Sequence, residues 1–98
     1  MKLLYVDLDG VVADFMSAVN THPKKDTHLY KEHPDTIPHI FRNLKPISGA
    51  INAVNILLKS SLYDVYFLST APWGNPSAWT DKRLWLEDRF GDKINRKL

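Results

Sequence analysis

The sequence predicts one α/β domain built on parallel strands, because two strand-like stretches alternate with stretches of helical periodicity. The strand-like stretches are residues 2–7 and 63–70. The helical stretches, each with a plausible start signal or an apolar stripe, are residues 11–19, 48–58 and 76–90. A right-handed crossover between the strands would make them parallel neighbours. We therefore expect the order strand, helix, insertion, helix, strand, helix.

The first strand ends in two aspartates, Asp7 and Asp9, followed by Gly10. The backbone curls at the end of a strand, so the two carboxylates can converge, and Gly10 allows a sharp exit into the next helix. Crowded carboxylates usually persist because a divalent cation lies between them. The competing interpretation is a polar turn, since Asp-Gly is a common turn pair. Because open parallel sheets bind ligands at this edge, the pattern indicates a metal site for an anionic substrate.

The connection from Thr21 to Pro46 differs in character from the segments around it. It contains four prolines and all four histidines of the chain, His22, His28, His33 and His39. Such a length is unusual inside a compact α/β unit, so we expect a functional insertion or a small subdomain. The histidine spacings match no closely spaced ligand pair, which favours surface or hydrogen-bonded histidines over a metal site. Its apolar members Leu29, Tyr30, Ile37, Ile40 and Phe41 would pack the insertion or face a substrate.

The second strand ends in two hydroxyl residues, Ser69 and Thr70, before Ala71 and a proline. Hydroxyls beside free backbone N–H groups at a strand end are suitable donors to a phosphate oxygen. The competing interpretation is a strand end trimmed with small polar residues. The preceding helix would be capped by Ser48 and would bury one apolar face through Ile51, Val54, Leu57 and Leu58.

The last helix has Asn75 or Ser77 as its predicted N-cap and Gly91 just after its end. Its apolar stripe consists of Ala78, Trp79, Trp85, Leu86 and Phe90. Lys82 could lean toward the strand ends, but a solvated lysine on the polar face is the interpretation that the pattern favours.

Three sequence blocks together resemble one known family. Asp7-Leu-Asp-Gly-Val-Val-Ala-Asp-Phe15 resembles motif I of the haloacid dehalogenase (HAD) superfamily, and within it the 5'(3')-deoxyribonucleotidases. Phe67-Leu-Ser-Thr-Ala-Pro-Trp73 resembles their motif II, and residues 79–91 resemble the helix that follows it. The resemblance implies a HAD-like Rossmannoid parallel sheet, with a core of residues 1–20 and 46–98 and a cap of residues 21–45.

The resemblance also implies site roles. Asp7 would be the nucleophile that forms an aspartyl-phosphate, and Asp9 the general acid and base. Mg²⁺ would bind the Asp7 side chain and the main-chain carbonyl of Asp9. Thr70 would contact the phosphate, with Ala71 beside it where some relatives have serine, and Lys82 is a further candidate for substrate binding. Phe15 would stack on the nucleobase, unless it is simply a core phenylalanine.

Family members continue beyond this pattern with a third strand, a motif III lysine and further metal-binding aspartates. The chain ends at residues 94–98, where that strand would begin, so we expect a sheet truncated after the second or third strand. Magnesium binding, with only Asp7 and one carbonyl from protein, would then be weak, and catalysis by the 98-residue form is not expected. Two parallel strands rarely form a stable sheet alone, and the open edge favours association, for example a homo-oligomer.

Composition excludes several partners. A net charge of +2 and a pI near 8.9 are too mild to indicate a nucleic-acid polymer or an anionic membrane surface. The absence of cysteine excludes disulfides and suits a cytoplasmic setting. The expected function is a Mg²⁺-dependent phosphatase for nucleoside monophosphates. The alternatives are an inactive binding module, a phosphatase for another small phosphate ester and, least favoured, a receiver-type signalling domain.

Overall fold

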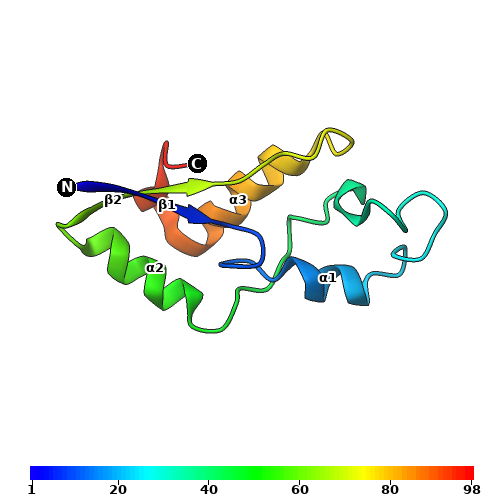
Figure 1. Ribbon diagram of the computed structural model, residues 1–98, viewed down its shortest axis with the longest axis horizontal. Helices are drawn as coiled ribbons and strands as arrows, with labels where there is room; N and C mark the ends of the chain where they lie inside the picture. Colours follow the sequence, from blue (N-terminus) through cyan, green and yellow to red (C-terminus); the bar gives the residue numbers. More distant parts are fainter.

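The computed structural model describes residues 1–98 and contains a two-stranded parallel sheet with three α-helices (Figure 1). The strands are β1 (Lys2–Asp7) and β2 (Tyr63–Leu68). The helices are α1 (Phe15–Thr21), α2 (Ala50–Lys59) and α3 (Ala78–Phe90). Short 3₁₀ helices cover Pro34–Thr36 (η1) and Gly91–Ile94 (η2). The predicted α/β class, with a parallel sheet, is confirmed.

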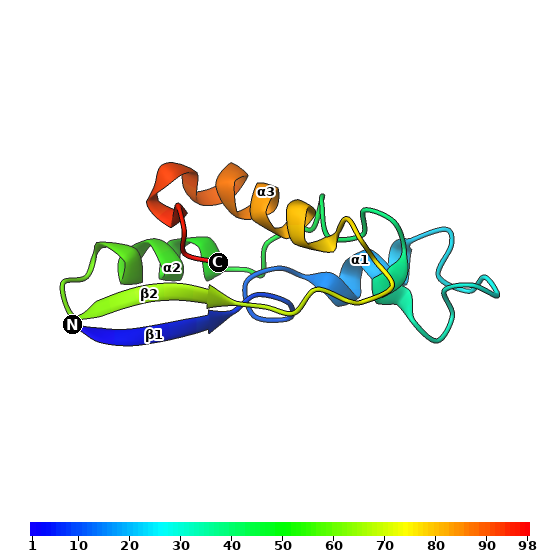
Figure 2. The same cartoon turned by 90° about the horizontal axis from the view of Figure 1, so that it is seen from above.

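Both strands run in the same direction and end at the same edge of the sheet. Their register pairs Lys2 with Tyr63 at one end and Asp7 with Leu68 at the other. Helices α2 and α3 lie on the same side of the sheet, where β2 contributes buried Val65 and Phe67 (Figure 2). This arrangement places the polar residues that follow β1 and β2 next to one another.

Part of the long insertion belongs to the hydrophobic core. Its buried members are Ile37, Ile40, Phe41 and Leu44, whereas Leu29 is 71% exposed. The indole Nε1 of Trp85 in α3 donates to the carbonyl oxygen of Leu44 over 2.7 Å. Residues 37–44 therefore pack against α3. The cap boundaries at residues 21 and 45 stay a prediction.

Helix α1 begins at Phe15, so the expectation that it begins at Val11 is wrong. The carbonyl oxygen of Leu8 accepts from the N–H groups of Val12 and Ala13, both at 2.9 Å, which closes a loop before the helix. Gly10 adopts φ 79° within this loop. A short bridge also pairs Ala13 with Pro46, so backbone pairing with a distant segment delays the start of the helix.

Two further expectations about the helices are wrong, one about the N-cap of α2 and one about the apolar stripe of α3. The N-cap of α2 is Gly49 at φ 80°, not Ser48, because the chain enters this helix through a left-handed residue. Ser77 does hold the N-cap position of α3, but its hydroxyl donates to the side chain of Asn75 rather than to the helix. Trp79 is 47% exposed, so it lies outside the buried stripe of α3.

The last residues of the chain lie beside β2. After η2, the N–H of Phe67 donates to the carbonyl oxygen of Lys97 over 2.6 Å. The side chain of Lys97 also binds Asp64 over 2.8 Å. The segment thus contacts the outer edge of β2 without forming a third strand. None of the helices has both the length and the apolar character that crossing a membrane requires.

Candidate active site

Three elements meet at the carboxyl ends of the strands. β1 ends at Asp7, and Asp9 follows in the loop that precedes α1. Ser69 follows β2 directly. Lys82 enters from the second turn of α3, which packs on the same side of the sheet. The parallel register and the crossover therefore bring together residues that are up to 73 positions apart in the sequence.

Lys82 is the centre of this cluster. It is 1% exposed, and its ammonium nitrogen donates to Asp9 Oδ2 over 2.8 Å, to Ser69 Oγ over 2.7 Å and to the carbonyl oxygen of Thr70. The same nitrogen lies 4.4 Å from the centre of the Phe41 ring. A buried ammonium is retained only when such partners replace its water, and here all three donor positions are used. The expectation of a solvated Lys82 is therefore wrong.

The two carboxylate oxygens of Asp9 have different surroundings. Oδ2 is bound by Lys82, and Ser69 Oγ lies 3.4 Å away from it. Oδ1 is buried and has no hydrogen-bond partner. A buried oxygen without a partner is costly, so it marks an atom available to a proton, a cation or a polar ligand.

The oxygen atoms around Asp7 and Asp9 suit a hard divalent cation. The Asp7 side chain is exposed, and the main-chain oxygen of Asp9 accepts no backbone hydrogen bond. With the unpaired Oδ1 of Asp9, the site offers oxygen ligands only, as Mg²⁺ prefers. No group of three or more His, Cys, Asp or Glu side chains is arranged to hold a metal. A cation here would keep several water ligands, which is usual for Mg²⁺.

Thr70 and Ala71 are both exposed just beyond β2. The carbonyl oxygen of Thr70 accepts from Lys82, and this bond fixes the main chain from which the Thr70 side chain extends at the sheet edge. Phe15 is partly buried against the core, and its ring stacks on Phe41 with centroids 5.2 Å apart. One face of the Phe15 ring is therefore taken by the core, and a ligand would have to use the remaining exposed part.

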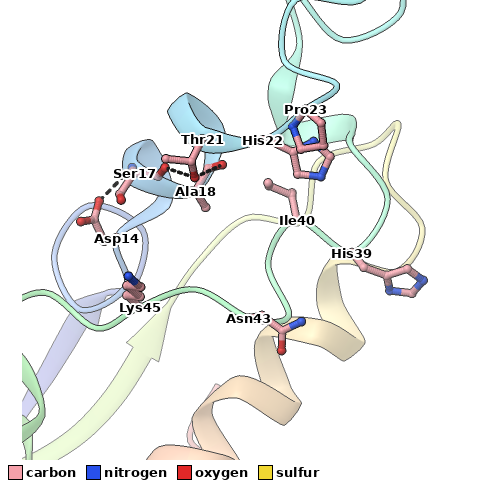
Figure 3. Close-up of a pocket in the computed structure, with 10 residues that line it drawn as sticks. All are labelled: Asp14, Ser17, Ala18, Thr21, His22, Pro23, His39, Ile40, Asn43 and Lys45. Carbon is pink, nitrogen blue, oxygen red and sulfur yellow. Dashed lines mark hydrogen bonds between the residues drawn. The ribbon is translucent and has the colours of Figure 1, made fainter.

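A hollow lies apart from Asp7 and Asp9, between α1 and the end of the insertion (Figure 3). Polar residues dominate its lining, among them Asp14, Ser17, His22, His39, Asn43 and Lys45. His39 Nδ1 lies 2.9 Å from Oδ2 of Asp81, whose side chain is only 6% exposed. This pair joins the insertion to α3 one residue before Lys82.

Sequence reasoning missed several residues of the cluster. Ser69 was visible only as one of two hydroxyls at a strand end, yet it contacts both Asp9 and Lys82. Phe41 was expected only to pack the insertion or face a substrate, because its partner Lys82 lies about forty residues away in the chain. Asp81, next to the cluster, carried no signal for its equally distant partner His39.

The chain is similar to curated proteins over nearly its whole length, although no family model matches it. It is 41% identical over 96 residues to a protein of Vibrio phage KVP40 named "Putative 5'(3')-deoxyribonucleotidase". That match covers 98% of this chain and 55% of the phage protein. A protein of Bordetella bronchiseptica with the same name is 28% identical, with 98% and 64% covered. A third, in Acanthamoeba polyphaga mimivirus, is 25% identical, with 97% and 54% covered.

These matches confirm the resemblance to the 5'(3')-deoxyribonucleotidases that the motifs indicated. The chain spans about half the length of the phage and mimivirus relatives and somewhat more of the bacterial one.

Proposed function

We propose that this chain, a relative of proteins named as deoxyribonucleotidases, provides the phosphate-reacting end of a HAD-type phosphatase for deoxyribonucleoside monophosphates. The observation that carries the proposal is the cluster of Asp9, Ser69 and Lys82 beside the exposed Asp7 at the sheet edge. A surface site with carboxylates and one buried ammonium suits chemistry on a small anionic substrate.

Asp7 is the proposed nucleophile. Its exposed carboxylate would attack phosphorus, form a P–O bond and expel the nucleoside oxygen, which gives an aspartyl-phosphate. Water would then attack phosphorus and break the bond between phosphorus and the Asp7 oxygen, which releases inorganic phosphate and restores the Asp7 carboxylate. An exposed position at the end of β1 supports this role because phosphorus must approach the carboxylate directly.

Asp9 is the proposed acid and base. Lys82 and Ser69 hold Oδ2, so the partner-free Oδ1 is the atom that can carry the proton. In the first step Asp9 would protonate the leaving nucleoside oxygen, and in the second it would take a proton from the attacking water. Lys82 would keep the carboxylate in one orientation during both steps.

Asp9 alone pairs with the buried ammonium of Lys82, and Asp7 adds a second carboxylate at the end of β1, so a phosphate would meet net negative charge. We propose that the Asp7 side chain and the main-chain carbonyl of Asp9 would hold Mg²⁺. When bound, Mg²⁺ offsets the repulsion between carboxylate and phosphate. The Thr70 hydroxyl would hold a phosphate oxygen, and the exposed part of Phe15 would contact the base.

The proposal is tested by incubating the purified chain with dUMP and Mg²⁺ and measuring phosphate release. Asp7→Asn is expected to abolish release while the circular dichroism spectrum stays unchanged. Asp26→Asn, which changes an exposed acid in the insertion, is the matched control and should keep the wild-type rate.

Either of two results would contradict the proposal. Equal phosphate release from wild type and Asp7→Asn would exclude the nucleophile. Saturable binding of dUMP without release, both for this chain and for a version joined to the rest of the phage relative, would favour a binding module.

A further inference from the structure

Asn75 joins the segment between β2 and α3 to the insertion, where the two lie side by side (Figure 2). It is 3% exposed, and its Nδ2 donates to the carbonyl oxygen of Asp35 over 3.0 Å and to that of Ile37 over 3.1 Å. Its Oδ1 accepts from the hydroxyl of Ser77 over 2.9 Å, so both ends of the amide have partners. A buried amide that is paired in this way holds the two segments in one arrangement.

The two segments also approach each other closely. A Cβ on Gly74 would lie 2.9 Å from Cγ2 of Thr36, so a larger residue would push the segments apart. The N–H of Asn75 donates to the carbonyl oxygen of Pro72 over 3.0 Å, which closes a tight turn around Gly74. Asn75 is the only residue between β2 and α3 whose hydrogen bonds reach the insertion.

The segment between β2 and α3 carries the proposed phosphate contact, Thr70. Lys82 of α3 binds the carbonyl oxygen of Thr70, and Asn75 binds the insertion further along the same segment. The segment is therefore fixed at two points, one on each side of its turn.

The insertion lies against the proposed base contact, Phe15. Phe41 follows Ile37 closely in the insertion, and its ring stacks on the Phe15 ring with centroids 5.2 Å apart. Thr70 and Phe15 would contact opposite ends of one nucleotide, and no hydrogen bond joins them directly. The bonds of Asn75 therefore help to set the spacing between the phosphate end and the base end of the site.

We propose that Asn75 is a positioning residue that determines the preference for a nucleoside monophosphate over a small phosphate ester. The inference rests on the proposed function, which assigns Thr70 and Phe15 to the two ends of one substrate. A ligand that touches both ends gains affinity when their spacing is preset, because it does not have to order the site on binding. A ligand that touches only the phosphate end does not depend on the insertion.

The experiment measures the binding of two non-hydrolysable ligands by NMR titration with Mg²⁺ present, so it requires no turnover. The ligands are the methylenephosphonate analogue of dUMP and methylphosphonate, which lacks the nucleoside. Asn75→Ala is expected to weaken binding of the dUMP analogue by about fivefold or more and that of methylphosphonate by less than about twofold. Ser77→Ala removes only the bond to Oδ1 of Asn75, so this matched control should keep the wild-type affinity ratio.

A second set of variants keeps the test decisive if circular dichroism shows that Asn75→Ala is unfolded. Gly74→Ala should separate the two segments and lower the affinity ratio, because its Cβ would crowd Cγ2 of Thr36. Adding Thr36→Ser removes that methyl group but keeps the hydroxyl that donates to the carbonyl oxygen of His33. The double variant should therefore regain the wild-type ratio. The side-chain amide protons of Asn75 should exchange slowly in wild type, faster in Gly74→Ala and slowly again in the double variant.

Three outcomes would overturn the inference. These are an equal loss of affinity for both ligands in Asn75→Ala, a wild-type chain without preference for the dUMP analogue, and a Gly74→Ala variant that Thr36→Ser does not rescue. Failure of the proposed function gives a different result. An Asn75-dependent preference for the dUMP analogue, together with no phosphate release from dUMP, would leave this inference standing and contradict the phosphatase.

Discussion

The ammonium nitrogen of Lys82 lies 2.8 Å from Oδ2 of Asp9, although 73 positions separate the two residues in the sequence. The lysine side chain is 2% exposed and the aspartate side chain is 27% exposed, so water reaches the pair from the Asp9 side only. Removing one partner of such a pair leaves the other charge poorly compensated, which costs more than the pair itself contributes.

Lys82→Met is therefore expected to lower the free energy of unfolding by about 3 kcal/mol. The cause is loss of the cation that binds Asp9, Ser69 and Thr70. Urea unfolding followed by circular dichroism measures the change. Arg83→Met, which alters the exposed neighbour, should stay within about 0.5 kcal/mol of wild type. Equal losses in the two variants would contradict the importance of the pair.

Trp85 is expected to be the tryptophan on which stability depends. It is 1% exposed and its Nε1 binds the carbonyl oxygen of Leu44 over 2.7 Å. Trp85→Phe removes that bond and leaves space in the core, so unfolding should become easier by about 2 kcal/mol. Trp73 is fully exposed, and Trp73→Phe is the control with an expected change within about 0.5 kcal/mol. Fluorescence should also show a blue-shifted emission that only Trp85→Phe removes.

Substitutions of Gly10 test the loop that lies where α1 was predicted to begin. A Cβ at this position would meet no atom within 4 Å, so the cost of Gly10→Ala comes from its φ of 79° alone. We expect a loss of about 1 kcal/mol in thermal or urea unfolding. Gly10→Asn should cost less, because asparagine adopts left-handed conformations more readily. A larger loss for asparagine than for alanine would indicate steric crowding instead.

The pair Lys97–Asp64 predicts a pH effect at the alkaline end. The hydrogen bond to Asp64 raises the pKa of Lys97 above its ordinary value of 10.5, although partial desolvation opposes it. Because the pKa of Lys97 is higher in the folded chain than in the unfolded chain, the ion pair contributes its full stabilisation of the fold at pH values below the pKa of Lys97 in the unfolded chain. This stabilisation is lost as pH rises through the folded pKa.

A ¹³C titration of the Lys97 side chain should show this directly, and Asp64→Asn should lower its pKa. The stability difference between wild type and Asp64→Asn should shrink above pH 10.5. A constant difference across this range would show that the ion pair is not its source.

Local patterns were sufficient for most of the secondary structure. A run of apolar residues predicted β1, an enrichment in β-branched and aromatic residues predicted β2, and apolar residues at helical spacing predicted the body of α3. The start of α1 was missed because the Leu8 carbonyl closes a loop that no periodicity reveals. The N-cap of α2 was missed because the left-handed Gly49 took the place expected for Ser48.

Sequence patterns alone were enough to predict the α/β class, the aspartates at the end of β1, the hydroxyls at the end of β2 and the resemblance to the deoxyribonucleotidases. These features depend on short stretches of chain and on motifs that are contiguous in sequence. The burial of Lys82 against Asp9, with Phe41 over its ammonium group, became visible only in the folded chain. A lysine on a helix is normally solvated, and its burial depends on which partners distant segments bring within reach of its ammonium group.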